Sequence, residues 1–237
     1  MSPLMRRPIS LTAAFAVLAF AASACSDDSS DNGGGGGGTT SDFVGVVTSD
    51  DGSENGSLSV TVATANPSSP SLTGVALASV NATGTLSLVG GAPVSLTGTY
   101  DDANGTLDVS GGGYSFTGGF DGSNRLEGTY TGPTTTGVFI TALGGTGTAF
   151  CGTFDGDDQG LWSFVVDGGT LLGQAVSTLG NGGIPLDGIV TGNAVTIYFP
   201  GTVTTLATGT ISGSNASGAW DDPNSSDAGT WTSGDCQ

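Results

Sequence analysis

Apolar and polar residues alternate along most of the chain after Phe43. The segments 57–62 and 94–100 show the alternation clearly, and no helical periodicity appears beyond the N-terminal segment. Period two is typical of half-buried strands, in which successive side chains face opposite sides of a sheet. Turn signals such as Asp51-Gly52 and Asn104-Gly105 separate these segments at about 8 to 12 residues. The pattern predicts an all-β fold, built as an antiparallel up-and-down meander.

The expected strands fall into two sets, one on each side of Gly145. The first set lies near residues 43–48, 57–64, 83–89, 94–100, 105–109, 114–120, 126–130 and 137–143, with a further segment at 72–80 left open. The second lies near residues 149–154, 161–166, 171–176, 186–191, 194–199, 206–212, 216–220 and 229–233. About eight antiparallel strands close a small barrel. We therefore expect two small eight-stranded barrels or barrel-like sheets, and one extended β-sandwich is the alternative.

A short repeat of glycine, a small residue and a bulky apolar residue recurs in these strands. Examples are the segments 128–130, 218–220 and 229–231. Glycine and the bulky residue share one face, so the glycine leaves space for a cross-strand aromatic ring and permits the sheet to curl. The repeat predicts core packing. The competing hypothesis is an exposed aromatic platform for sugars, as in a carbohydrate-binding module.

The first 24 residues have the pattern of a secretory signal peptide. Arg6 and Arg7 give a basic start, and an apolar run follows from Ile9 to Ala22. Small residues then precede Cys25 directly. An apolar run of about 14 residues is too short to span a hydrocarbon core of roughly 30 Å.

The small-small-Cys ending at Cys25 is similar to the lipobox of bacterial lipoproteins. The resemblance implies that the signal is cleaved before Cys25 and that its thiol is acylated, which anchors the protein in the cell envelope. Ser26 stands where an aspartate would favour inner-membrane retention, so the outer membrane is the expected location, on its periplasmic or its surface face. The anchor makes the membrane one partner of the protein.

Residues 25–42 are expected to form a flexible tether. They are rich in Ser, Asp and Gly and include six consecutive glycines, 33–38, so they lack the apolar residues that a core requires. An acylated cysteine followed by polyglycine resembles the surface lipoproteins related to transferrin-binding proteins, which carry small β-barrels. We thus divide the chain into the signal (1–24), the tether (25–42), an N-terminal β-meander domain (43–145) and a C-terminal barrel-like domain (146–237).

The two remaining cysteines bracket the C-terminal domain. Cys151 lies on its first expected strand and Cys236 follows its last. In an oxidising compartment, and in a closed barrel whose first and last strands are neighbours, a disulfide between them would pin the closure.

Charge and composition exclude several classes of function. The chain has 21 acidic residues, no histidine and only three basic residues, of which Arg125 alone follows the signal. A field of this sign repels nucleic acid. Without histidine or lysine there is no Ser-His-Asp, Cys-His or Schiff-base arrangement. Carboxylate pairs remain, but they lie in turns where Asp is expected for capping the bend: Asp101 with Asp102, Asp157 with Asp158, and Asp221 with Asp222.

One acidic turn resembles part of a calcium loop. Asp155, Asp157, Gln159 and Gly160 partly follow the first half of an EF-hand loop, but Val166 stands where the bidentate acid belongs. The turn that could bind a cation weakly holds Asp155, Asp157 and Asp158. An ordinary hairpin turn is the preferred interpretation, with weak cation binding as the alternative. No metal or cofactor is expected.

The sequence therefore predicts a monomeric, non-catalytic, lipid-anchored envelope or cell-surface β-protein that acts as a binding or structural module, with a protein or glycan partner left unidentified. A carrier of a small apolar ligand, of lipocalin-like type, is the alternative, beside the carbohydrate-binding module. A barrel interior filled with side chains leaves no room for a ligand, whereas an open interior would favour the carrier. The side chains expected to fill them are Tyr100, Phe116, Phe120, Tyr130, Phe164, Trp220 and Trp231.

Overall fold

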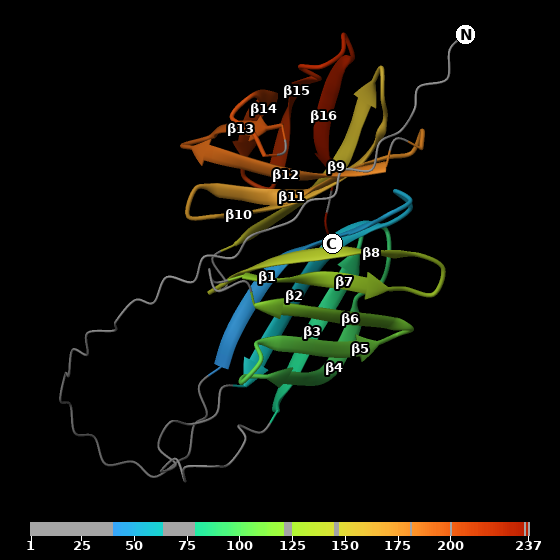
Figure 1. Cartoon of the computed structure of the whole chain (residues 1–237), viewed down its shortest axis with the longest axis vertical. Coiled ribbons are helices and arrows are strands. Elements are labelled where there is room, and N and C mark those ends of the chain that lie inside the picture. The colour runs from blue at the N-terminus through green and yellow to red at the C-terminus, as the bar shows by residue number, and fades with distance from the viewer. Residues whose placement is uncertain are drawn as a thin grey trace, which may run out of the picture. The chain divides into compact units, whose positions relative to one another are not determined.

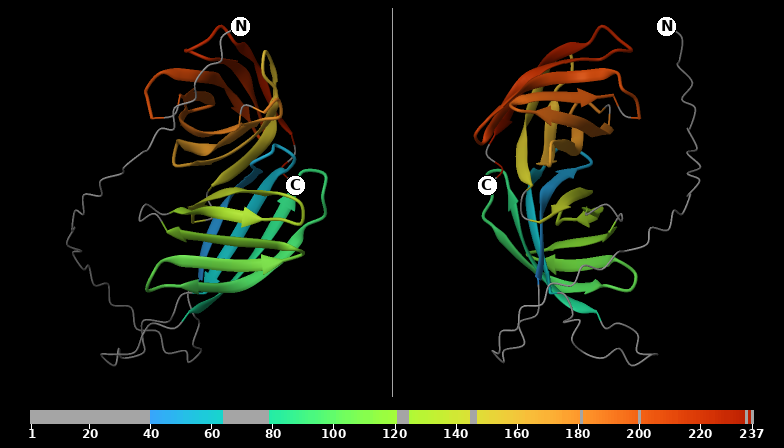
Figure 2. Two further views of the ribbon diagram at one scale, coloured as in Figure 1. Left: turned by 45° about the vertical axis from the view of Figure 1, so that its right-hand side comes forward. Right: turned by 90° about the vertical axis from the view of Figure 1, so that its left-hand side faces the viewer.

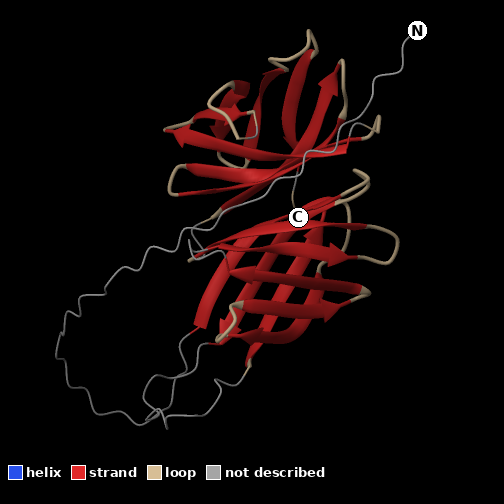
Figure 3. Cartoon of the chain, in the orientation of Figure 1, coloured by secondary structure: helices blue, strands red, loops and turns tan. Residues whose placement is uncertain are grey.

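The computed structural model describes residues 40–63, 79–120, 125–144, 147–180, 182–199, 201–234 and 236. Every regular element within these ranges is a β-strand, as Figure 3 shows. The search of these residues for an apolar helix long enough to cross a bilayer finds none. The segment 72–80, left open above, lies almost wholly outside the described residues, and β3 begins at its last position.

The first eight strands form one closed antiparallel barrel, drawn from blue to yellow-green in Figure 1. Each strand pairs with the next, and β1 pairs with β8 to close the sheet. The strands are β1 (Thr40–Ser49), β2 (Asn55–Ala63), β3 (Val80–Leu88), β4 (Val94–Asp101), β5 (Thr106–Gly111), β6 (Tyr114–Phe120), β7 (Arg125–Thr131) and β8 (Thr136–Leu143). We call this the N-terminal barrel.

The remaining strands form a second closed barrel with the same connectivity, drawn from yellow to red in Figures 1 and 2. It closes where β16 pairs with β9. The strands are β9 (Thr148–Gly156), β10 (Gly160–Asp167), β11 (Thr170–Ser177), β12 (Gly182–Thr191), β13 (Ala194–Tyr198), β14 (Thr205–Ser212), β15 (Asn215–Asp221) and β16 (Ala228–Gly234). We call this the C-terminal barrel.

The predicted fold class is confirmed, and the alternative of one extended sandwich is wrong because both sheets close on themselves. The largest differences in strand bounds are at three strand starts. β1 begins at Thr40 rather than near 43, β3 at Val80 rather than near 83, and β12 at Gly182 rather than near 186. The extensions of β1 and β12 consist of residues without apolar alternation. Their strand conformation comes from pairing with β2 and β11, which a local pattern does not reveal.

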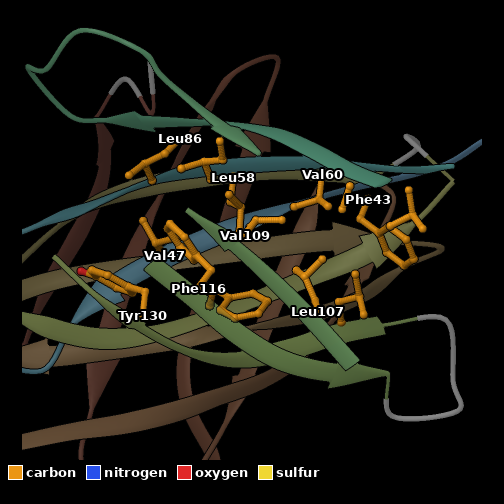
Figure 4. Packing of buried hydrophobic residues seen from close by; sticks show 14 residues of the cluster. Phe43, Val47, Leu58, Val60, Leu86, Leu107, Val109, Phe116 and Tyr130 are labelled. Carbon is orange, nitrogen blue, oxygen red and sulfur yellow. The ribbon is translucent and has the colours of Figure 1, made fainter. Parts of the chain in front are cut away.

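Large side chains fill the interior of the N-terminal barrel (Figure 4). Phe116 stacks on Tyr130 with ring centroids 5.4 Å apart, and Phe139 meets Phe116 edge-on at 5.7 Å. Leucines from the facing strands complete the core, and Leu58, Leu86, Leu96 and Leu107 are at most 1% exposed. Burial of this apolar surface is the main stabilising term for the barrel.

The two barrels belong to one compact unit of the chain and share a buried seam. Val46 points outward from the N-terminal barrel and Val165 outward from the C-terminal one, yet they are only 2% and 1% exposed. The Nδ2 group of Asn55 donates to the carbonyl oxygens of Gly152 and Trp162 at 3.3 and 3.1 Å. The seam thus joins apolar contact to hydrogen bonds that are themselves buried.

Candidate ligand-binding site

A cavity of about 440 Å³ occupies one end of the C-terminal barrel. This is the end at which β9 turns into β10, β11 into β12, β13 into β14 and β15 into β16, because alternate turns of an up-and-down barrel share an end. Eighteen residues line the cavity: Phe154, Asp157, Asp158, Trp162, Phe164, Ala175, Ser177, Gly182, Ile184, Leu186, Ile197, Phe199, Leu206, Ala207, Trp220, Asp222, Asp227 and Trp231. The opposite end is filled by buried side chains that include Phe150 and Leu171.

Six aromatic rings form much of the cavity wall. Trp162 stacks on Phe164 with ring centroids 4.7 Å apart and meets Trp231 edge-on at 5.3 Å. Trp220 meets Phe154 edge-on at 6.1 Å. Edge-to-face and stacked pairs of this kind hold rings in defined orientations. The wall therefore presents aromatic rings in defined orientations beside aliphatic side chains such as Leu186 and Ile197.

Glycines behind the tryptophans allow the rings to lie close against the sheet. A Cβ at Gly152 would stand 2.6 Å from Trp162 Cζ2, and one at Gly229 would stand 2.6 Å from Trp220 Nε1. Real Cβ atoms do not approach so closely, so any other residue would push the ring into the lumen. The predicted role of the glycine-aromatic repeat in packing is confirmed at these positions.

The cavity remains open because small residues face the rings. Ala175 and Ala207 lie in the cavity wall on β11 and β14, and their short side chains leave space in the lumen. The missing side-chain volume lies at the end lined by Phe154 and Trp220. Two barrels of equal strand number thus differ in the volume of their inward side chains.

Four aspartates stand at the cavity mouth, on two turns that barrel closure brings together. Asp157 and Asp158 belong to the β9–β10 turn, and Asp222 and Asp227 to the β15–β16 turn. Asp157 Oδ2 accepts from the backbone amide of Ala228 at 3.0 Å and so links the two turns. The carboxylates therefore have positions fixed by the backbone, and they line the only part of the cavity wall that carries charge among the described residues.

Hydrogen-bond donors are scarce in the wall. The Nε1 groups of Trp162 and Trp231 donate to the carbonyl oxygens of Thr153 and Ala219 at 3.0 and 3.3 Å. Trp220 Nε1 is buried against Gly229 without a hydrogen-bond partner. The Ser177 hydroxyl donates to Asp158 at 2.8 Å. The charged groups of the wall are acceptors, so the cavity combines an apolar aromatic interior with an accepting, anionic mouth.

The structure brings together some of the residues singled out from the sequence. Cys151 and Cys236 form a disulfide with Cα atoms 5.1 Å apart, as predicted, beside the β9–β16 pairing that closes the C-terminal barrel. Cys25, the proposed lipidation site, lies outside the described residues, as do the signal and nearly all of the tether. Asp155 pairs with Thr230 in the sheet.

Asp157 and Asp158, expected in a hairpin turn, occupy that turn. A search of the described residues finds no group of three or more His, Cys, Asp or Glu side chains placed to hold a metal ion. The alternative of weak cation binding at Asp155, Asp157 and Asp158 therefore gains no support from geometry.

The aromatic residues expected to fill both barrels behave differently in each. Phe116, Tyr130, Phe164 and Trp231 are at most 4% exposed, whereas Phe120 is 37% exposed. Tyr100 and Trp220 are half-buried, and Trp220 with Trp231 and Phe164 lines the cavity. The interior of the C-terminal barrel is therefore only partly filled.

Sequence reasoning missed the cavity residues Phe154, Trp162 and Phe199 and the hydrogen bond from Ala228 to Asp157 that links the two acidic turns. One signal for the mouth was present. In an up-and-down barrel the acidic turns 157–158 and 221–227 belong to the same end of the sheet, since an even number of strands separates them.

Two tyrosines and one glutamate form a polar cluster in the N-terminal barrel. Tyr114 Oη donates to Glu54 Oε1 at 3.1 Å, while Tyr130 Oη and Glu54 Oε2 are buried without a hydrogen-bond partner in the structure. Burial, and after it the charge of Glu54, raises the pKa of Tyr130 well above its usual value.

Comparison of the chain with protein-family models gives no match, and comparison with curated proteins gives none either. Geometry and composition therefore carry the functional proposal.

Proposed function

We propose that this protein is a lipid-anchored binding protein of the bacterial cell envelope, whose C-terminal barrel holds a small, largely apolar molecule. The observation that carries the proposal is the aromatic-lined cavity of about 440 Å³. Ligand pockets occupy roughly 300 to 1,000 Å³ and combine apolar walls with a few polar groups, and the mouth of a small β-barrel is a recurrent place for them.

The neighbouring barrel supports a ligand role over a purely structural one. The N-terminal barrel fills its interior with side chains such as Phe116 and Leu107, both fully buried. The same architecture is therefore stable without a cavity. An unfilled lumen forfeits dispersion contacts that a structural module has no reason to lose.

A binding role also suits the chemistry of the chain better than catalysis. There is no histidine, and no lysine, in the entire sequence. Three of the carboxylates at the mouth accept hydrogen bonds that hold the turns: Asp222 from the amide of Asn224 at 2.8 Å, Asp157 from the amide of Ala228 and Asp158 from the hydroxyl of Ser177. We propose that these groups position turns and tune binding rather than transfer protons.

Binding of N-phenylnaphthylamine, a neutral apolar dye whose fluorescence rises in apolar surroundings, tests the proposal. The full chain carrying Cys25→Ser should bind it, because no acyl chain then competes for the lumen. Ala207→Phe fills the cavity and should abolish the signal. Ala219→Phe adds the same ring to an exposed position on the next strand and should leave the signal unchanged.

Absence of dye binding to the parent protein, or equal binding by the Ala207→Phe variant, would overturn the proposed cavity function. Cell fractionation tests the anchor separately. Wild type should sediment with membranes and carry labelled fatty acid, and Cys25→Ser should lose both; unchanged membrane retention without label on the wild type would remove the lipoprotein assignment.

A further inference from the structure

We infer that the ligand of the C-terminal barrel is an organic cation: an amine or quaternary ammonium with an apolar body. This inference rests on the proposed function and specifies its ligand class. The structure joins a hydrophobic lumen to a mouth whose charged groups are all carboxylates. A molecule complementary to both has an apolar portion and a positive group.

The charge around the cavity has one sign throughout this barrel. Residues 148–237 contain nine aspartates and no lysine, arginine, histidine or glutamate. Four of the nine line the cavity itself, at Asp157, Asp158, Asp222 and Asp227. Several like charges at the mouth of an apolar cavity focus the field there, which raises the local concentration of cations and repels anions. An acidic ligand, such as a fatty acid, is therefore disfavoured.

The aromatic wall favours the same sign of charge. The faces of tryptophan rings attract cations, most strongly where water is excluded, and cages of such rings recognise quaternary ammonium groups. Trp162 and Trp231 are 3% and 4% exposed and nearly perpendicular, with an interplanar angle of 87°. Trp220 and Phe154 provide a second perpendicular pair, at 86°, on the same cavity. The aromatic rings and the carboxylates thus both favour a positively charged ligand.

Hydrogen-bonding capacity agrees with this assignment. Ionised carboxylates only accept, and the Ser177 hydroxyl in the wall already donates to Asp158. Trp220 Nε1 has no hydrogen-bond partner, but it is buried and lies against Gly229. The charged groups that a ligand meets at the mouth are acceptors, and a ligand with donors or a diffuse positive charge complements them. An ammonium group supplies three donors, and a quaternary ammonium supplies the charge alone.

Displacement of N-phenylnaphthylamine by three probes of one shape and different charge tests the inference. Phenylbutylamine is a cation at pH 7, phenylbutanol is neutral and phenylbutyrate is an anion. Phenylbutylamine should displace the dye at concentrations about tenfold lower than phenylbutanol, and phenylbutyrate should be the weakest. The advantage of the amine should shrink as salt is raised, because salt screens the mouth.

Asp→Asn variants test whether the aspartates at the cavity mouth cause the preference for the amine. Asp222→Asn with Asp227→Asn should weaken phenylbutylamine by about fivefold or more and leave phenylbutanol unchanged. Asp187→Asn removes a carboxylate from the exposed outer wall of the same barrel and is the matched control, with an expected change of less than twofold.

The outcomes separate the two proposals. Displacement by phenylbutanol or phenylbutyrate at concentrations equal to or below those of phenylbutylamine would overturn the cationic assignment and keep the cavity function. Equal effects of the mouth variant and Asp187→Asn would overturn the role given to the mouth. Failure of the dye itself to bind would remove the cavity function, and the inference with it.

Discussion

The two barrels share strand number, connectivity and the placement of glycine behind aromatic rings, yet one is filled and the other is partly hollow. In the N-terminal barrel, Phe139 lies over Gly128, whose Cβ would stand 2.9 Å from the ring. In the C-terminal barrel, Trp220 lies over Gly229 in the same way. The inward side chains differ, because leucines such as Leu58, Leu96 and Leu107 are buried in one lumen, whereas Ala175 and Ala207 are among the residues that line the cavity of the other. Architecture therefore sets the diameter, and inward side-chain volume decides whether a ligand fits.

All three tryptophans lie in the C-terminal barrel, at positions 162, 220 and 231. Tryptophan fluorescence consequently reports unfolding of that barrel alone, whereas calorimetry reports both. The comparison between the barrels can thus be tested with two independent signals.

The largest effect should come from emptying the filled barrel. Phe116→Ala removes a fully buried ring and should lower the free energy of unfolding by about 3 to 5 kcal/mol. Trp220→Ala removes a half-buried ring at the cavity and should lower it by only about 1 to 2 kcal/mol. Denaturant titration of both variants measures the difference. Equal losses would contradict the contrast between a full and a partly hollow core.

Loss of the disulfide should come next. The Cys151–Cys236 bond closes a separation of 85 residues, so the double change Cys151→Ala, Cys236→Ala should destabilise by about 2 to 4 kcal/mol. The fluorescence transition should shift more than the transition of the N-terminal barrel. Reduction of the wild type with dithiothreitol should reproduce the shift. A fluorescence transition that does not move would show that strand pairing alone fastens β16 to β9.

A smaller effect is expected at the seam. Asn55→Ala removes donors to the carbonyl oxygens of Gly152 and Trp162 and should cost about 1 to 3 kcal/mol. Fluorescence and calorimetry should then report transitions further apart than in the wild type. Asn81→Ala, at an exposed position, is the control. Coincident, unshifted transitions in Asn55→Ala would mean that the other contacts of the seam, among them the hydrogen bond from the Ser163 hydroxyl to the Val47 carbonyl oxygen, couple the barrels without Asn55.

The smallest change should be a gain. Tyr130→Phe removes a buried hydroxyl that lacks a hydrogen-bond partner and should raise stability by about 1 kcal/mol at pH 8. Burial raises the folded-state pKa of Tyr130, so the folded protein keeps its phenol proton at a pH at which the unfolded chain has lost it. The wild type should therefore keep its stability up to about pH 10 and lose stability as the pH rises from there through the folded-state pKa.

Urea unfolding at pH 8 and pH 11 measures both parts of this prediction. The wild type should lose more stability between the two values than Tyr130→Phe does. Tyr198→Phe, on the outer wall of the other barrel, should behave like the wild type. An equal loss in all three proteins would show that Tyr130 does not dominate the alkaline response.

The strands and their closure could be predicted because they depend on local signals. Alternation from Ser57 to Val62 indicates a strand by itself, and Asp51-Gly52 indicates the turn before it. The disulfide could be predicted as well, since Cys151 and Cys236 bracket a set of strands that closes. These features need no knowledge of which side chains meet across the sheet.

The cavity could not be predicted in this way, because it depends on the combined volume of the side chains that several strands direct into the lumen. Ala207 on β14 matters only together with Ala175 on β11, and no local pattern joins them. The acidic mouth depends on closure, which brings the turn of Asp157 to that of Asp227. The seam is equally non-local, since Asn55 precedes the expected strand at 57–64 and nothing near it in the sequence indicates a contact with a second barrel.

The cavity mouth and the disulfide lie at opposite ends of the C-terminal barrel. Cys151 and Cys236 fasten the sheet near the filled end, whereas the mouth consists of four turns that the covalent bond does not touch. Substitution or lengthening of those turns changes the entrance without loosening the closure. In the binding role proposed above, recognition can diversify in these turns while one disulfide at the opposite end preserves the frame of the barrel.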